Sequence, residues 1–168
     1  MRRIAALLFL VPITAAGCGG GSTETATHME TRMSPAPPSK ADFISHADAI
    51  CHNHASRRED LESQANELGP LDAKDAHRVA DLLREASDNL RAEAQELQAL
   101  RPPPAGAGAL GPLVSIVGVQ ASVLDRWAEA YDDLNPAAIR RRQLRVAQVN
   151  TKADRIAQGY GFEVCARV

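Results

Sequence analysis

The amino-acid sequence predicts an all-α fold, an antiparallel up-down bundle of four helices. Ala, Leu, Arg, Glu and Gln dominate the composition, and this mixture favours helices. Apolar residues recur every three or four positions in four stretches, as they do along amphipathic helices. Short segments containing proline or glycine separate the stretches, so consecutive helices are expected to lie antiparallel.

The first helix is expected to begin after Ser39. The Ser39 side chain can cap the helix, and Asp42 is favoured near the positive helix end. Glycine and proline at 69–70 end the apolar pattern, which predicts a helix of roughly 30 residues. The stripe of apolar or small residues comprises Phe43, Ala47, Ile50, Leu61, Ala65 and Leu68, with His54 among them.

The second helix is expected to run from Asp72 to the three prolines at 102–104. Residues 105–111 are mainly glycine and alanine, which predicts a loop. The third helix is expected to start at Pro112, because proline suits the first turn of a helix.

The fourth helix is expected to begin with Asn135 as its cap and Pro136 as its first residue. It is expected to end at Gly159. Aromatic and apolar residues beyond that point would let an extended tail lie back along the bundle.

The beginning of the chain has the features of an export signal. Two arginines precede an apolar run at 4–16 that is too short to span a bilayer as a helix. The run leads into Ala15-Ala16-Gly17-Cys18, which resembles the bacterial lipoprotein lipobox. The resemblance implies that 1–17 is a removed signal peptide and that Cys18 carries lipid, often with a further acyl group such as palmitate. It also implies a lipid-anchored protein on the extracytoplasmic side of the cell membrane.

Residues 18–38 are small, polar and proline-rich, without apolar periodicity. This composition predicts a tether between the lipidated cysteine and the folded part. The four-helix domain is therefore expected at 39–168.

Two cysteines besides Cys18 occur in the chain, Cys51 and Cys165. Such a pair in an exported protein is expected to form a disulfide, and two free buried thiols are the alternative. In an up-down bundle the end of the fourth helix lies beside the start of the first. Cys165 in the tail can therefore reach Cys51 in the first helix.

Histidines concentrate in the first helix. His46, Asp48 and His52 are candidate metal ligands, because the four-residue spacing of Asp48 and His52 lets two side chains share an ion. The same residues are typical of a solvent-exposed helix face, and that interpretation is favoured. His54 interrupts the apolar stripe, which predicts either a polar layer in the core or a histidine with one hydrogen bond at the core edge.

Motifs of the known bundle chemistries are missing from the sequence. There is no Glu-x-x-His pair for a di-iron site and no Cys-x-x-Cys-His for a c-type haem. Gly-x-Ser-x-Gly, phosphate-loop and zinc-protease motifs are missing as well. We therefore expect no enzymatic activity and no cofactor.

A basic run at Arg140, Arg141, Arg142 and Arg145 has two interpretations. It could contact anionic lipid head groups or acidic wall polymers. The favoured interpretation is pairing within the bundle and solvation, because the third helix offers acidic residues nearby. These are Asp125, Glu129, Asp132 and Asp133.

Two short motifs carry a further likeness. Ser-Lys-Ala-Asp-Phe-Ile-x-x-Ala-Asp-Ala-Ile-Cys at 39–51 and Tyr-Gly-Phe-x-Val-Cys at 160–165 resemble a group of exported helical proteins of high-GC Gram-positive bacteria. The resemblance supports the pairing of Cys51 with Cys165 and implies no activity.

Together these features predict a membrane-anchored, non-enzymatic binding or interaction module. Its expected partners, besides the membrane, are a protein, a wall polymer or a small apolar ligand. Extracytoplasmic metal binding through the histidines at 46–54 is the alternative. The formal net charge of −2, which removal of residues 1–17 makes more negative, argues against nucleic acid as a partner.

Overall fold

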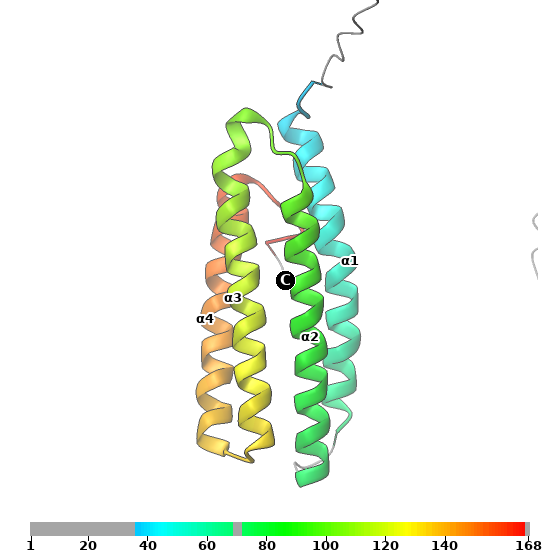
Figure 1. Ribbon diagram of the computed structural model, residues 1–168, viewed down its shortest axis with the longest axis vertical. Helices are drawn as coiled ribbons and strands as arrows, with labels where there is room; N and C mark the ends of the chain where they lie inside the picture. Colours follow the sequence, from blue (N-terminus) through cyan, green and yellow to red (C-terminus); the bar gives the residue numbers. More distant parts are fainter. Residues whose placement is uncertain (1–35, 69–71, 167–168) are drawn as a thin grey trace, which may run out of the picture. The chain divides into compact units, whose positions relative to one another are not determined.

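The computed structural model describes residues 36–68 and 72–166. It contains four long helices: α1 (Lys40–Asn66), α2 (Ala73–Ala99), α3 (Ala107–Asp132) and α4 (Pro136–Tyr160). A 3₁₀ turn, η1 (Pro104–Gly106), precedes α3, and no strand occurs in the described ranges (Figure 1). The predicted all-α four-helix fold is confirmed. The expected signal peptide, the lipidation site Cys18 and most of the tether lie outside the described residues.

Side-chain caps at the starts of α1, α2 and α4 confirm the boundaries expected from the sequence. In each case a side-chain oxygen accepts a hydrogen bond from the backbone N–H three residues later, which satisfies one unpaired donor of the first turn. The oxygen-to-nitrogen distances are 3.1 Å for Ser39 to Asp42, 2.8 Å for Asp72 to Asp75 and 3.0 Å for Asn135 to Ala138. α4 ends at Tyr160, one residue beyond the expected Gly159. It stops there because Gly161 has a φ of 106°, in the left-handed region that glycine favours.

The predicted start of the third helix is wrong. α3 begins at Ala107 and contains Pro112, so most of the expected loop at 105–111 is helical. Pro112 lies in the second turn, where the missing N–H removes one intrahelical hydrogen bond. The extra turn buries Leu110, which is 8% exposed, and this apolar burial offsets the loss.

Consecutive helices pack against one another, and α3 forms the two largest interfaces, with α2 and α4. The segment Gly108–Asp132 is long and apolar enough to cross a membrane by length and composition alone. Its place between α2 and α4 accounts for this character, because a core helix is apolar on most of its faces. α1 and α4 have almost no close backbone approach to each other.

The segment after α4 crosses from α4 to α1 and fills the space between them at one end of the bundle (Figure 1). The predicted disulfide between Cys51 and Cys165 is confirmed, with a Cα–Cα distance of 5.2 Å. Both Asp48 oxygens accept backbone hydrogen bonds from the tail. The distances are 3.0 Å from Glu163, 2.9 Å from Val164 and 3.0 Å from Cys165.

An aromatic cluster completes this end of the bundle. Phe43 of α1 packs edge-on against Tyr160, with ring centroids 5.9 Å apart, and lies 6.0 Å from the Phe162 ring. Gly106 allows the close approach of Tyr160, because a Cβ at this position would lie 2.0 Å from the Tyr160 hydroxyl. The tail therefore fills the space between α1 and α4 at this end of the bundle. We call its described residues, 161–166, the wedge.

Candidate ligand-binding site

A cavity of about 820 Å³ lies among the four helices in the half of the bundle away from the disulfide. It is partly open to solvent. Apolar side chains form most of its wall: Leu61 of α1, Leu82 and Leu83 of α2, Val123, Leu124 and Trp127 of α3, and Val146 and Val149 of α4.

The residues of α1 explain why this half of the bundle stays open. Three of the four buried side chains of α1 precede residue 52, and only Leu61 is buried in the cavity half. The inward positions there hold small or charged residues, such as Ala55, Arg58 and Ala65, which line the cavity without filling it. Similarly, the three buried side chains of α4 all lie at or after Val149. No segment of the described residues packs between α1 and α4 here, and the two helices stand apart.

Arg58 is the charged group of the cavity wall with the most contacts. One guanidinium nitrogen, Nη1, donates to Glu93 of α2 and to Asn89 at 3.2 Å. The other terminal nitrogen, Nη2, is buried and has no hydrogen-bond partner among the described residues. A buried donor without a partner is costly.

Two further polar features lie in the wall. Trp127 Nε1 is buried and, like Arg58 Nη2, lacks a hydrogen-bond partner in the part of the chain that the structure describes. Gln120 and Asn150 join α3 to α4, with Nε2 of Gln120 donating to Oδ1 of Asn150 at 3.0 Å. The cavity thus combines apolar walls with a few polar side chains, the usual composition of a small-molecule site.

Glu93 lies behind Arg58 and is almost completely enclosed, with 3% of its side chain exposed. Burial raises the pKa of Glu93 above its ordinary value, and the charge and hydrogen bond of Arg58 only partly oppose this shift. When Glu93 is ionised, its negative charge cancels the positive charge of Arg58. Glu59 and Glu62 also line the cavity, so the wall favours neutral or cationic ligands over anions.

The candidate metal ligands do not come together. His46 and His52 are exposed, whereas both Asp48 oxygens face the amides of the tail. Among the described residues no group of three or more His, Cys, Asp or Glu side chains could hold a metal ion. All three candidates lie outside the cavity, and Asp48 instead orders the tail.

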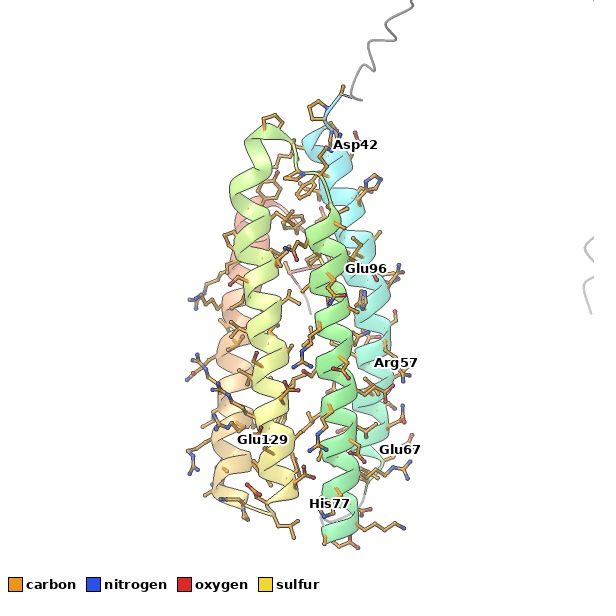
Figure 2. The ribbon with its side chains drawn as sticks, viewed as in Figure 1. Asp42, Arg57, Glu67, His77, Glu96 and Glu129 are labelled. Carbon is orange, nitrogen blue, oxygen red and sulfur yellow. A yellow bond between two sulfur atoms is a disulfide. The ribbon has the colours of Figure 1, made fainter. Side chains whose placement is uncertain are left out.

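His54 lies at the seam between α1 and α2, with 11% of its side chain exposed. Its Nε2 is 3.2 Å from Glu96 Oε1, and Arg57 pairs with Glu85 further along the same seam. Figure 2 shows Arg57 of α1 and Glu96 of α2 along this border. Together with the pair of Arg58 and Glu93, these contacts form a polar seam between α1 and α2 rather than a layer through the core.

The expected pairing of the basic run with α3 is wrong. Asp125 pairs with Arg91, and Asp132 pairs with Arg84 and His77, so α2 uses two of the four acidic groups expected to pair. The reason is the position of α2, whose basic side chains point along the surface it shares with α3. Consistently, hydrogen bonds from His77 and Arg84 lower the pKa of Asp132.

Sequence patterns did not reveal the cavity. The one available signal was in α1, where small and charged residues occupy positions that should be large and apolar in a closed bundle. Comparisons with family models, with curated proteins and with solved structures found no match. Function is therefore inferred from the residues of this chain alone.

Proposed function

We propose that this protein is a membrane-anchored extracytoplasmic lipoprotein that binds a small, mainly apolar ligand between its helices without transforming it. The cavity is the observation that carries this proposal. Its volume of about 820 Å³ falls within the range of roughly 300 to 1,000 Å³ that is typical of small-molecule sites.

The wall suggests the chemistry of the ligand. Leucine, valine and tryptophan side chains favour an apolar body. The polar side chains Arg58, Gln120 and Asn150 in the wall favour one or two polar groups on it. Because Glu59 and Glu62 add negative charge, a neutral molecule such as an ester, a ketone or an alcohol fits best.

Binding rather than catalysis is favoured by the side chains present. The described residues that line the cavity include no Ser, Thr, Cys, His or Lys, so the common nucleophiles and the common general base are not at hand. The lipobox-like sequence at Cys18 supports the anchor and the location. The negative net charge gives nucleic acid no role as a partner.

Dye binding tests the proposal directly. Trp127 is the single tryptophan of the chain and lines the cavity, so its fluorescence reports occupancy. Titration with the neutral apolar dye Nile red should quench Trp127 and increase the dye emission. Ala86→Leu places a larger side chain in the wall and should weaken dye binding about tenfold.

Ala49→Leu is the matched control, because it adds the same volume at an exposed position of α1. This variant should bind the dye as the parent protein does. Equal dye affinity in all three proteins, or no response of Trp127, would contradict the proposal.

A further inference from the structure

α4 has a charge that sets it apart from the rest of the chain. It carries six basic residues against one acidic residue, Asp154, whereas the whole chain has a formal net charge of −2. Side chains with nitrogen ends project from α4 away from the other helices (Figure 2). The basic residues are Arg140, Arg141, Arg142, Arg145, Lys152 and Arg155.

Five of the six lie on one face. At 100° per residue, Arg140, Arg141, Arg145, Lys152 and Arg155 fall within about 140° of the helix circumference. All five are exposed, and this sector contains no acidic residue. Asp154 falls outside the sector. We call these five residues the cationic face of α4.

The cationic face differs in its contacts from four arginines of α1 and α2. On α1 and α2, arginines 57, 58, 84 and 91 each pair with a carboxylate. For the cationic face, no carboxylate of the described residues lies within ion-pair distance. Its one hydrogen bond is from Arg145 to Gln148 at 3.3 Å. Like charges are therefore held together on one helix without compensation within the domain.

An apolar residue stands in the middle of these charges. Leu144 is 62% exposed, the most exposed of the large hydrophobic residues described, and lies one turn from Arg140 and Arg141 and next to Arg145. A leucine surrounded by arginines suits the boundary of a lipid bilayer, where the cations meet head groups and the leucine enters the acyl region. A polyanion alone would gain nothing from Leu144.

We propose that the cationic face of α4 and Leu144 dock the domain on an anionic phospholipid surface. This inference goes beyond ligand binding in the cavity and does not depend on it. α4 also lines the cavity through Gln143 and Val146, so docking would hold the cavity close to lipid.

Vesicle binding tests the proposal. The chain from residue 18 onward is used with Cys18→Ser, so that no attached lipid contributes, and it contains the whole compact unit from residue 35. Vesicles of phosphatidylglycerol and phosphatidylcholine in equal parts should bind it on sedimentation, and pure phosphatidylcholine vesicles should not. Salt at about 0.5 M should release it, because the interaction is screened.

Two variants and two controls separate this surface from net charge and general stickiness. Arg140→Gln/Arg141→Gln/Arg145→Gln should weaken binding about 100-fold, since each basic residue near an anionic surface contributes roughly a factor of five. The matched control changes three exposed arginines outside α4, Arg78→Gln/Arg101→Gln/Arg126→Gln, and should bind almost normally.

Leu144→Ser should weaken binding about fivefold. Val119→Ser removes an apolar side chain that is 38% exposed on α3 and should leave binding unchanged. Helical circular dichroism and thermal unfolding confirm that each variant is folded.

The outcomes are distinct. Loss of vesicle binding in the α4 variants with an unchanged helical spectrum supports the proposal. Equal loss in the α4 variants and the matched controls would overturn it, as would binding that is independent of anionic lipid. Binding to soluble polyphosphate without binding to vesicles would overturn it in favour of a polyanionic polymer.

Discussion

The two ends of the bundle differ although the same four helices form both. At the disulfide end, the tail brings Phe162 and Cys165 between α1 and α4, and both are buried. At the other end, no described segment enters this seam, and the cavity occupies the space. The comparison shows that the helices by themselves do not close the bundle, because α1 and α4 need a wedge to meet.

The largest expected effect removes the covalent link at the closed end. Cys51→Ser/Cys165→Ser opens a loop with a sequence separation of 114 residues. The free energy of unfolding should fall by about 4 kcal/mol in the chain-entropy description of disulfides. Urea denaturation at equilibrium measures this loss, and adding reductant to the parent protein should reproduce it. A change below about 1 kcal/mol would mean that the noncovalent wedge suffices.

Asp48→Asn acts at the same end without touching the disulfide. Three backbone N–H groups donate to the carboxylate, and an amide has one acceptor oxygen and no charge. We expect a loss of about 2 kcal/mol in the free energy of unfolding. His52→Ala, an exposed neighbour on α1, should cost less than about 0.5 kcal/mol. Similar costs for both variants would contradict the assigned role of Asp48.

At the open end, in contrast, a substitution should increase the free energy of unfolding. Ala86→Leu fills part of the cavity and should raise the free energy of unfolding by about 1 kcal/mol, because it buries apolar surface without displacing packed side chains. Thermal unfolding measures this gain. A loss of stability would show that the open end is as tightly packed as the closed end.

The smallest expected effect is a pH dependence that originates at Glu93. Because burial raises the pKa of Glu93 in the folded protein, its contribution to stability is full below the ordinary value of 4.5. The contribution is lost as pH rises through the raised pKa. Glu93→Gln should remove this decline, and the stability of the variant should fall less between pH 4.5 and pH 7 than that of the parent protein. Parallel pH profiles of the two proteins would exclude this role of Glu93.

Local signals were sufficient to predict most of the fold. Ser39 and Asn135 were correctly expected to cap helices, because capping depends on residues only three positions apart. The second helix was correctly expected to start at Asp72, which caps it in the structure. The start of α3 was missed for the opposite reason. Burial of Leu110 against the core is a long-range gain that outweighs the local preference of Pro112 for a first turn.

The candidate site was less predictable than the fold. The pattern at His46, Asp48 and His52 was interpreted as an exposed helix face, with a metal site as the alternative. Neither interpretation included the partners of Asp48, which are amides more than 100 residues away in sequence. Likewise, the arginines of α4 were expected to pair with acidic groups of α3, of which Asp125 and Asp132 pair with α2 instead. Side chains from different helices compete for the same partner, and the residue spacing within one helix does not show which of them will bind it.

The sequence by itself determined the four helices, the starts of three of them and the cysteine pair, because periodicity, caps and export context act locally or through simple topology. Only the tertiary structure decided where the seam between α1 and α4 is closed. That outcome depends on how far the tail reaches and on whether inward residues such as Arg58 and Phe43 can fill the space between helices. Packing in three dimensions therefore produced both the cavity and the uncompensated charge of α4.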